Sequence, residues 1–422
     1  MTGRRSFIKN SILSLSSGIL VSPASISHYF DKNTNPGESD DFWKEIRKKF
    51  PLTDERVYFN NGTIGPSPYP VIKAINDTIL KLNSWGEYNG YNDSRRPVAD
   101  FVHVTEDEIS LTHNTTEGIN IIAAGLPLKR GDEVIMTTHE HAGNALPWLN
   151  QQEQKGIVIK AFSPGKDAAT TLNLISDLIN PRTRVIAVPH ITCTTGHVMP
   201  VKSIATLGHD KGLWVFFDGA HAPGSLDLNV GEIDCDFYAS CGHKWMLGPS
   251  GTGFVYVKKE LQPILNPMGI GAYSDTGWEI SESRQILSGY VPTAHKYDYG
   301  TQSAALAHGL KAAVEFMDGI GMEKVEAYSS GLTDQLFNGL REIGHPVEIL
   351  TPSEMSSRGT MVTFRIKDRD YKTFGQMASE RKFRIRLVPE SGLDAIRIST
   401  HIYNNRGQVD EFVSMVSDFV KA

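Results

Sequence analysis

One lysine stands out because of its place between two apolar runs. Lys244 follows a Gly-His pair in the stretch FYASCGHKWMLGPSGTGFVYV (237–257), which reads as two strands joined by small residues. An ammonium group between two buried strands is costly unless its charge is paired or its amine takes part in chemistry. Most lysines lie on polar surface connections, so this stretch by itself leaves both interpretations open.

Polar residues able to do chemistry follow five apolar runs of the chain. A strand-end Asp is often only a cap, and a lone His is more often structural, but in open α/β sheets ligands bind beyond the carboxyl ends of the strands. We therefore expect these segments to meet in one site. They are HNTTEGIN (113–120), HEHAGNALPW (139–148), ITCTTGH (191–197), DGAH (218–221) and CGHKW (241–245).

The first of these segments predicts a phosphate site. Thr115 and Thr116 precede a predicted helix that contains Glu117 and Gly118. Hydroxyl groups and free backbone N–H groups at a helix N-terminus bind phosphate. A simple helix cap by Thr115 or Thr116 explains the same string, and that alternative stays open.

Two further strings resemble known motifs only in part. GPSGTG (248–253) lacks the Lys-Ser/Thr ending of a P-loop and stands between strands, so we interpret it as a turn. HEH (139–141) offers two histidines but no third ligand at a suitable spacing, so we predict no metal site.

The segments that must position these residues alternate between strand-like and helix-like patterns, which predicts an α/β domain around a mostly parallel, buried sheet. Stretches with helical spacing lie between the strand-like runs EVIMTT (133–138), RVIAVPH (184–190), LWVFFD (213–218) and GFVYVKK (253–259). Beyond residue 303, a long helix followed by strand, helix, strand and helix predicts a smaller α+β domain.

The composition is that of a globular protein with ample material for a core. The 422 residues are 40% hydrophobic and 21% charged, and the net charge is -6. No basic block suggests a nucleic-acid partner. The three cysteines (Cys193, Cys235 and Cys241) argue against a disulfide framework, and their spacing fits no zinc pattern.

The N-terminus carries a targeting pattern. Arg4 and Arg5 precede a mildly apolar, serine-rich segment that is too short and too polar to span a bilayer. Arg-Arg-x-Phe-Ile-Lys resembles a twin-arginine export signal, and the alternative is a disordered basic tail. We therefore expect a periplasmic protein that is carried in folded form by the twin-arginine export machinery, without stable membrane insertion.

Five motifs in order resemble the class V aminotransferase family. The strings are NTTEGIN, EHAGNALPW, FFDGAHAPG, DCDFYASCGHKW and IRISTHIYNN, within a match from about Val57 to Val420. These are fold-type-I pyridoxal-phosphate enzymes, which include cysteine desulfurases and isopenicillin N epimerase-like proteins. The resemblance implies a large domain with a mostly parallel sheet of the seven-stranded type and a smaller C-terminal domain.

The predicted organisation follows from the pattern and the resemblance together. An export signal (1–27) and a linker with an N-terminal arm (28–56) precede a large cofactor-binding domain (57–302) and a small C-terminal domain (303–422).

The resemblance implies a role for each residue that contacts the cofactor ring. Lys244 matches the lysine that bonds the aldehyde of pyridoxal 5'-phosphate and later moves the substrate proton. Asp218 matches the aspartate that pairs with the pyridine nitrogen and keeps the ring an electron sink. His141 matches the histidine stacked on the ring. His221 stands where desulfurases have Gln and is expected to reach the ring hydroxyl.

The remaining matches imply contacts to phosphate and substrate. Thr115, Thr116 and His243 match phosphate ligands. Thr301, in YGTQS, matches a segment that a neighbouring subunit lends to the phosphate, which implies a homodimer. Arg397 matches the arginine that holds the substrate carboxylate, a bidentate task for which its planar fork is suited.

The chain departs from the family where thiol chemistry would be expected. Cys241 stands three residues before Lys244, where the family often has Ser, and Cys193 stands where desulfurases have a strand-end Asn. Desulfurases attack the substrate sulfur with a cysteine on a C-terminal loop, but the corresponding ERKFRIRLVPESG (380–392) contains none. A persulfide mechanism needs that thiolate.

The sequence therefore predicts a pyridoxal-phosphate enzyme that acts at Cα of an amino acid or of a peptide-borne amino acid. The main prediction is a transaminase or epimerase. The alternative within the family is a cysteine desulfurase or C–S lyase. An alternative of another class is a non-catalytic binding protein that keeps the cofactor site, which the joint presence of Lys244, Asp218 and Arg397 disfavours.

Overall fold

The structure is a computed structural model that describes residues 40–87 and 90–422. The predicted export signal (1–27) lies outside the described residues, as does the first part of the predicted linker (28–39). In the part of the chain that is described, no helix has the length and apolar character needed to cross a membrane.

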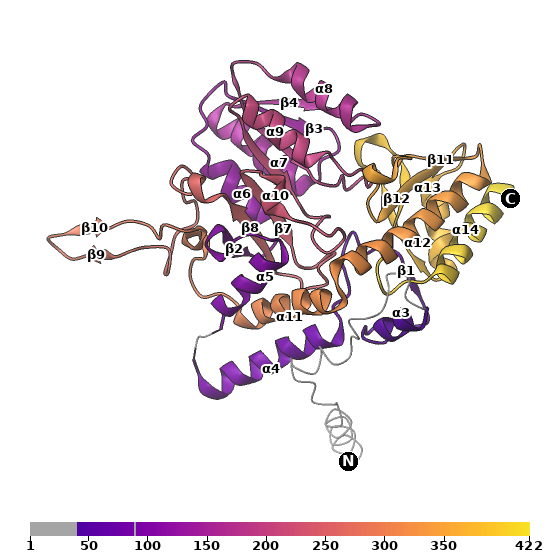
Figure 1. Ribbon diagram of the computed structural model, residues 1–422, viewed down its shortest axis with the longest axis horizontal. Helices are drawn as coiled ribbons and strands as arrows, with labels where there is room; N and C mark the ends of the chain where they lie inside the picture. The colour runs from indigo at the N-terminus through magenta and orange to yellow at the C-terminus, as the bar shows by residue number, and fades with distance from the viewer. Residues whose placement is uncertain (1–39, 88–89) are drawn as a thin grey trace, which may run out of the picture. The chain divides into compact units, whose positions relative to one another are not determined.

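Seven strands form the central sheet, in the order β2-β8-β7-β6-β5-β3-β4 (Figure 1). The strands from β7 to β4 run parallel, whereas β8 is antiparallel to both β2 and β7. The predicted α/β sheet, mostly parallel and seven-stranded, is confirmed. Its strands are β2 (Ile109–Thr112), β3 (Glu133–Thr137), β4 (Val158–Phe162), β5 (Thr183–Pro189), β6 (Trp214–Asp218), β7 (Phe237–Cys241) and β8 (Gly253–Val257).

Helices follow or precede these strands along the chain. The helices α6 and α7 pack on each other, and α6 also packs on β7 and β8. The helix α9 packs on β6 and contacts α8 and α10. The helices of this part are α4 (Tyr69–Trp85), α5 (Arg95–Phe101), α6 (Thr115–Gly125), α7 (Ala142–Lys155), α8 (Ala168–Leu178), α9 (Val201–Asp210) and α10 (Val230–Ile233).

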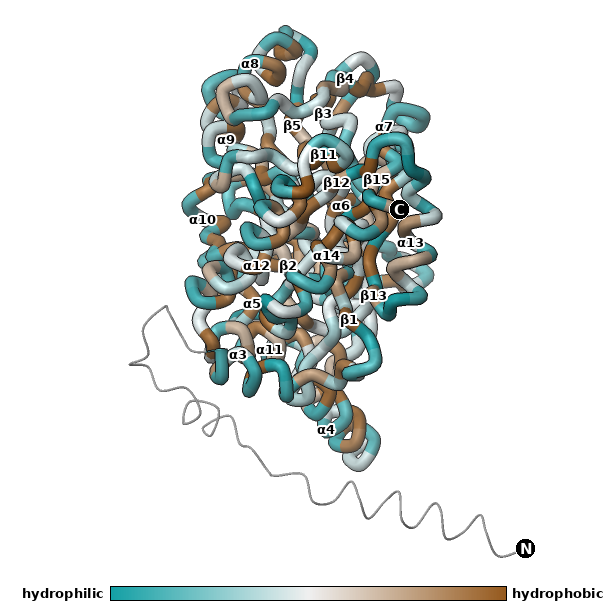
Figure 2. The backbone as a smooth tube through the Cα atoms, turned by 90° about the vertical axis from the view of Figure 1, so that its right-hand side faces the viewer, coloured by the Kyte–Doolittle hydropathy of each residue, from teal (hydrophilic) through white to brown (hydrophobic). Residues whose placement is uncertain are grey.

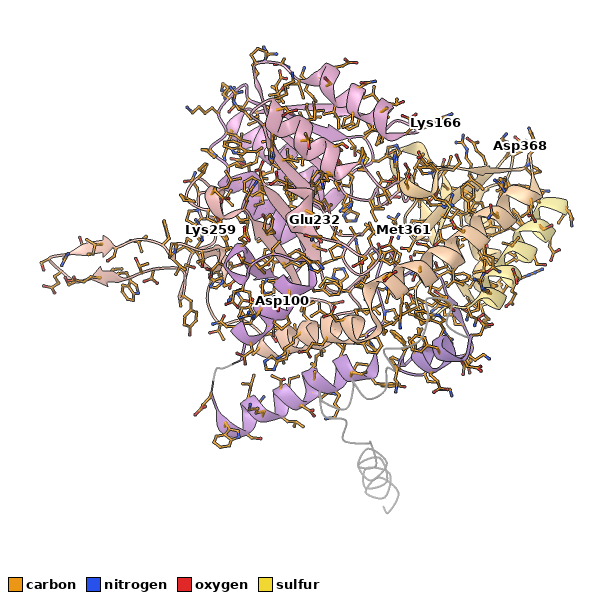
Figure 3. The ribbon with its side chains drawn as sticks, in the orientation of Figure 1. Asp100, Lys166, Glu232, Lys259, Met361 and Asp368 are labelled. Atoms are coloured by element: carbon orange, nitrogen blue, oxygen red, sulfur yellow. The ribbon has the colours of Figure 1, made fainter. Side chains whose placement is uncertain are left out.

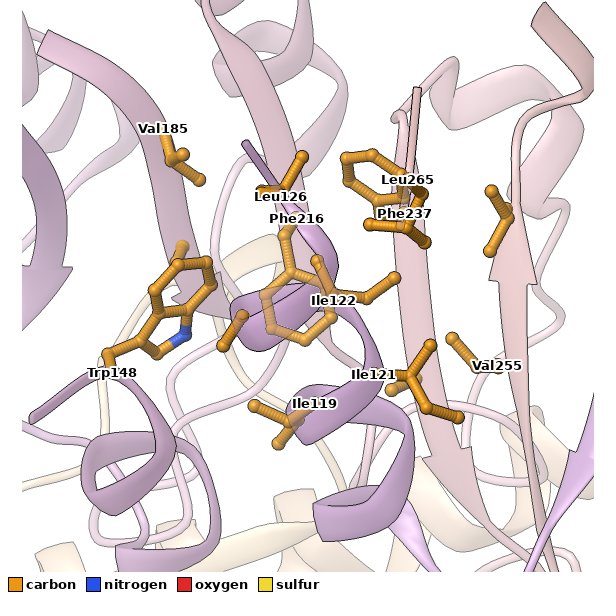
Figure 4. Close-up of a cluster of buried hydrophobic side chains, with 14 of the residues drawn as sticks. Ile119, Ile121, Ile122, Leu126, Trp148, Val185, Phe216, Phe237, Val255 and Leu265 are labelled. Atoms are coloured by element: carbon orange, nitrogen blue, oxygen red, sulfur yellow. The ribbon is translucent and has the colours of Figure 1, made fainter. Parts of the chain in front are cut away.

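A buried apolar cluster joins α6 and α7 to the sheet. Ile119 and Ile122 of α6 and Trp148 of α7 pack with Phe216 of β6 and Phe237 of β7 (Figure 4). All residues of β3 and β7 are buried. Parallel strands covered by helices read as continuous apolar runs for this reason, which explains why they could be found in the sequence.

The C-terminal elements form a second, smaller sheet with its own core. It is antiparallel, in the order β11-β12-β15-β14. Phe364, Phe374 and Phe412 are fully buried in the cluster beside it. The elements are α12 (Met322–Ile343), β11 (Val347–Ile349), β12 (Met361–Ile366), α13 (Tyr371–Glu380), β13 (Phe383–Arg384), β14 (Arg386–Val388), β15 (Ala395–Ser399) and α14 (Arg406–Lys421).

The segment that begins the predicted large domain reaches the C-terminal elements. The short strand β1 (Val57–Tyr58) pairs in parallel with β13, and Phe59 belongs to the C-terminal core. The first helix described, α3 (Asp40–Arg47), buries Trp43, which stacks on Tyr328 of α12. The predicted domain boundaries stay predictions.

The sequence analysis did not predict the hairpin of β9 (Trp278–Ile280) and β10 (Gln285–Leu287) or the helix α4. The hairpin projects from the sheet (Figure 1), and its Trp278 is 67% exposed. The helix α4 packs along α11 (Ala304–Ile320), and apolar and hydrophilic residues alternate along α4 in Figure 2. Short 3₁₀ turns complete the fold: η1 (Asn92–Ser94), η2 (Glu106–Glu108), η3 (Lys259–Leu261), η4 (Ala294–Tyr297), η5 (Met355–Ser357) and η6 (Glu390–Gly392).

Candidate active site

A cavity of about 250 Å³ lies where β5, β6 and β7 end and where α6 and α7 begin. Ligands bind at this edge of open α/β sheets, so its place agrees with the expectation drawn from the strand ends. The predicted residues that line it are Thr115, Thr116, His141, Asp218, His221, His243, Lys244 and Arg397.

Thr301 is the one predicted site residue that lies elsewhere. It lines a second, larger cavity of about 470 Å³, together with Arg95 and Asp298. These two form a buried ion pair. Size does not identify the active site here, because this larger cavity contains none of the residues that follow the sheet strands. The predicted contact of Thr301 with the phosphate of a neighbouring subunit stays a prediction.

Lys244 enters the cavity from the chain that leaves β7. Its Nζ lies 3.2 Å from His221 Nε2. The N-terminal segment packs directly against this backbone, since Gly65 N donates to the carbonyl of His243 at 2.7 Å. A Cβ on Gly65 would lie 1.9 Å from the Lys244 carbonyl oxygen, so only glycine allows the approach. Residues far apart in the sequence therefore hold Lys244 in place.

Asp218 ends β6 and is 6% exposed. Its Oδ1 accepts a hydrogen bond of 2.9 Å from the backbone N–H of Ala220. Burial raises the pKa of Asp218, while the Ala220 hydrogen bond and the charge of Lys244 act against that rise. A buried carboxylate facing this cavity stabilises a cationic ring nitrogen, which is the partner implied for it by the resemblance.

His141 caps α7, and its ring orientation follows from that. The Nδ1 atom accepts from the backbone N–H of Gly143 at 3.0 Å. Burial lowers the pKa of His141, and the charge of Lys244 lowers it further. The lowered pKa favours the neutral ring, and the hydrogen bond from Gly143 places its single proton on Nε2.

A buried carboxylate beside His141 holds this turn, and sequence reasoning missed it. Glu140 accepts from the backbone N–H and the hydroxyl of Thr137 at 2.9 and 2.7 Å, and from Asn144 at 2.7 Å. Asn144 in turn accepts from the indole of Trp148. Burial raises the pKa of Glu140 to about 7. The network joins the end of β3 to the first turn of α7.

The start of α6 offers unpartnered donors for a phosphate. The helix is capped by Asn114, whose side chain accepts from the N–H of Glu117 at 2.9 Å. The alternative that Thr115 or Thr116 serves as the cap is therefore wrong. Thr115 Oγ1 is buried without a hydrogen-bond partner of good geometry, and the weakly bonding thiol of Cys241 interacts with it.

His243 adds a second unpartnered atom to this cradle. Its Nδ1 is buried and makes no hydrogen bond, and burial lowers its pKa to about 4. Buried polar atoms in folded proteins are nearly always paired, so two unpartnered atoms beside a helix N-terminus suit a bound anion. The residues fit the phosphate of pyridoxal 5'-phosphate.

Arg397 on β15 supplies a buried cation on the opposite wall. It is 1% exposed, and its Nη1 donates to the carbonyl of Cys193 at 2.5 Å. The Nη2 atom donates to Thr63 at 3.3 Å, but Nε is buried without a partner. Burial lowers the pKa of Arg397, followed by the charge of nearby Arg386. An unpartnered guanidinium edge suits a carboxylate.

Two more lining residues were missed by the sequence analysis. Arg386 of β14 lines the cavity and pairs with Glu390. Gly62 lies against Arg397, and a Cβ there would be 2.9 Å from Nη2 and 3.0 Å from Met361 Sδ. Met361 lies on the side of the C-terminal elements nearer the central sheet (Figure 3). Arg386 stands directly opposite Arg397, because β14 and β15 are paired antiparallel strands, and this register has no signal in the local sequence.

The three cysteines are buried and carry raised pKa values. Cys193 and Cys241 line the cavity, as expected for residues that follow sheet strands, whereas Cys235 is fully buried in the core. Burial raises the pKa of Cys193 to about 11, and it also raises the pKa of Cys241 and of Cys235. Neither of the lining thiols lies on the 380–392 segment.

The two histidines of the HEH string have different surroundings. His139 contacts Thr194 at 2.7 Å, and His141 faces the cavity. Within residues 40–87 and 90–422, no group of three or more His, Cys, Asp or Glu side chains could hold a metal ion.

Comparisons with known proteins agree with this fold. The sequence profile described as "Aminotransferase class-V" matches residues 80–412. A probable cysteine desulfurase of Methanothermobacter thermautotrophicus is 31% identical over 72% of this chain and 79% of its own length. A probable cysteine desulfurase of Pyrococcus abyssi is 27% identical over 90% of this chain and 98% of its own length.

Solved structures of related enzymes have the same fold. The apo cysteine desulfurase of Thermococcus onnurineus NA1 superposes with a TM-score of 0.80 and 26% identity, over 90% of this chain and 98% of that one. A cystine C–S lyase, solved with its product cysteine persulfide, shares the fold at a TM-score of 0.80 and 24% identity, over 87% and 99% of the two chains. The chain therefore belongs to the class-V aminotransferase family and is a pyridoxal-phosphate-dependent enzyme.

Proposed function

We propose that this enzyme cleaves the carbon–sulfur bond of a cysteine-like amino acid by elimination. Relatives named as probable cysteine desulfurases favour C–S chemistry, the alternative in the sequence analysis, over the main prediction of transamination or epimerisation. Elimination is favoured over persulfide transfer by one observation: residues 380–392 contain no cysteine, and the three thiols of the chain are buried elsewhere.

The lining residues divide the work of such a reaction. When bound, pyridoxal 5'-phosphate supplies an electron sink that weakens bonds to the substrate Cα. Asp218 maintains the positive charge that this sink requires. Arg397 holds the substrate carboxylate through its free Nε edge. Lys244 carries the only amine among the described side chains that line the cavity, so it takes the Cα proton and returns it to the leaving sulfur.

The net reaction balances without any oxidant or protein thiol. With L-cysteine, the Cα–H and Cβ–S bonds break, and water then releases the nitrogen. Cysteine and water give pyruvate, ammonia and hydrogen sulfide. A desulfurase would instead form a persulfide on the enzyme and release alanine, which requires a reactive thiolate.

The products of a single substrate panel test the proposal. Purified enzyme is incubated with L-cysteine and L-cystine, and sulfide, pyruvate, ammonia, alanine and D-cysteine are quantified, with Lys244→Ala as the inactive control. Equal amounts of pyruvate and ammonia support elimination. Alanine together with a protein persulfide would support a desulfurase instead. D-cysteine would support an epimerase, and a 2-oxo acid that retains sulfur would support a transaminase. Absence of any product from a cofactor-loaded enzyme would favour a binding protein.

We also propose that the enzyme is a homodimer. Thr301 lines a cavity separate from the active site of its own chain, as expected if it serves a neighbouring subunit. Sedimentation of wild type and Thr301→Ala, each with cofactor, tests this proposal. The expected result is a wild-type dimer in which the substitution weakens retention of the cofactor.

Export to the periplasm is proposed from the sequence alone. Arg4 and Arg5 stand in the predicted twin-arginine signal, outside the described residues. Replacing both by Lys should leave cofactor-loaded enzyme in the cytoplasm, as measured by fractionation. An unchanged periplasmic yield would contradict the signal.

A further inference from the structure

A chain of hydrogen bonds leads from the C-terminal elements to Lys244. The indole Nε1 of Trp245 donates to His221 Nδ1 at 3.1 Å. The other nitrogen of the same imidazole, Nε2, lies 3.2 Å from Lys244 Nζ. Trp245 therefore contacts its sequence neighbour, Lys244, through a histidine from a different strand end.

The hydrogen-bond donors in this chain determine the tautomer of His221. An indole N–H only donates, so His221 Nδ1 must be an unprotonated acceptor. Burial lowers the pKa of His221 well below its usual value. The ring is neutral, and its single proton lies on Nε2.

The position of that proton matters for Lys244. The Nε2–H group points at Nζ, where a hydrogen bond forms only if the amine accepts. A protonated lysine carries three donors and no acceptor, so this hydrogen bond can form only with the unprotonated amine. This is the form that can attack an aldehyde.

Trp245 itself is held firmly from the other side. His401 Nδ1 accepts from the backbone N–H of Ile402 at 2.7 Å, so its proton lies on Nε2, which donates to the Trp245 carbonyl at 3.0 Å. The His401 ring also stacks on the indole, with ring centroids 5.6 Å apart. Trp245 is 1% exposed. The indole N–H therefore has a fixed direction.

We propose that Trp245 is a positioning residue that locks His221 as the Nε2–H tautomer, so that His221 presents a permanent donor to Lys244 and to the cavity. His221 cannot serve as a proton acceptor in this arrangement, because Nε2 already carries its proton and the indole blocks protonation of Nδ1. The inference rests on the lysine–cofactor site and does not depend on which substrate bond is cleaved.

The tautomer can be measured directly in the full-length protein. With ¹⁵N-labelled histidine, the His221 signals are assigned by comparison with His221→Ala. We expect an unprotonated Nδ1 and a protonated Nε2 that do not titrate from about pH 6 to about pH 9, either side of the ordinary histidine pKa. In Trp245→Phe the signals should become those of a tautomer mixture. A wild-type Nδ1–H signal, or titration within this range, would overturn the proposal.

A second measurement separates positioning from a merely structural role. Apo enzyme is mixed with pyridoxal 5'-phosphate, and the link to Lys244 is trapped with borohydride and followed by mass spectrometry. Losing one ordinary hydrogen bond should slow linkage about fivefold in Trp245→Phe. The same change in a His221→Ala background should have no further effect. Trp43→Phe, which removes a buried indole from α3, is the control.

Equal slowing by Trp245→Phe in both backgrounds would show that the indole acts by packing alone and would refute the proposal. If Trp245→Phe does not fold, the wild-type histidine spectrum decides by itself.

Discussion

Replacement of Cys193 by Ser tests whether any thiol of the chain attacks the substrate sulfur. Cys193 lines the cavity. Its backbone carbonyl, not its sulfur, accepts the hydrogen bond from Arg397. Serine keeps that carbonyl and nearly the same volume. The substitution therefore removes the thiol and leaves the position of Arg397 intact.

The expected size of the effect follows from the protonation of Cys193. Burial raises its pKa to about 11, so at about pH 8 roughly one molecule in a thousand carries the thiolate. A cysteine with an ordinary pKa of about 8.5 would be roughly one quarter thiolate under the same conditions. The reactive fraction is therefore lower by a factor of a few hundred, and Cys193 is a poor nucleophile.

We expect Cys193→Ser to retain sulfide release from L-cysteine within about tenfold of wild type, equivalent to ~1.4 kcal/mol in the barrier. The triple variant that also carries Cys235→Ala and Cys241→Ser should behave in the same way. Sulfide and pyruvate are measured at steady state, and intact protein is examined by mass spectrometry after a single turnover. Cys235→Ala alone is the control, because Cys235 lies in the core.

A loss of more than about a hundredfold in Cys193→Ser, together with a stoichiometric persulfide on Cys193 in wild type, would refute this reasoning. It would mean that the bound cofactor or substrate makes a buried thiol reactive, and the enzyme would then act as a desulfurase with a thiol on a strand end.

Three further predictions concern the cofactor link, the carboxylate site and the pH dependence of stability. Borohydride should fix pyridoxal 5'-phosphate to Lys244, and Lys244→Ala should abolish the adduct in peptide mapping; an adduct on another lysine would contradict the assignment. In Gly62→Ala the added Cβ meets Nη2 of Arg397 at 2.9 Å, so KM should rise about tenfold with a smaller change in kcat, and unchanged kinetics would contradict this role of Arg397. Burial raises the pKa of Glu140 to about 7 from an ordinary value near 4.5, so the unfolded chain releases this proton first and the free energy of unfolding should fall by about 3 kcal/mol as pH rises from about 4.5 to about 7. In Glu140→Gln this decrease in the free energy of unfolding should be absent, as measured by urea denaturation at both pH values. An equal pH dependence of stability in wild type and variant would contradict the raised pKa of Glu140.

The sequence was informative wherever a local pattern carries the physics. Helix-covered parallel strands are apolar throughout, so the inner strands β3, β5, β6 and β7 were visible as runs in the chain. The edge strand β4, whose residues are mostly not buried, was not predicted. Ligands bind beyond the carboxyl ends of such strands, so Asp218 and Lys244 could be expected in one site before any contact was known, whereas their individual roles came from the resemblance to the family. The motif order was enough to indicate the family and its cofactor.

The sequence did not reveal contacts between residues distant along the chain. The bridge from Asn60 to Ser399 and the packing of Gly65 on Lys244 join segments that share no local pattern. Arg386 and Glu140 were missed because a lone charged residue is usually solvent-exposed. The projecting β9–β10 hairpin was missed because its short strands have no buried face that would produce alternation.

The tertiary structure also decided which of several neighbouring residues takes a given role. Thr115, Thr116 and Asn114 are all good capping residues, and only the backbone geometry at the start of α6 shows that Asn114 caps and leaves Thr115 Oγ1 unpartnered. The tautomer of His221 depends in the same way on an indole N–H that folding brings to Nδ1. Residue types and their order along the chain determined which polar groups were available to the site. The direction of each side chain and its hydrogen-bond partner depend on contacts between residues far apart in the sequence, and only the folded chain decides them.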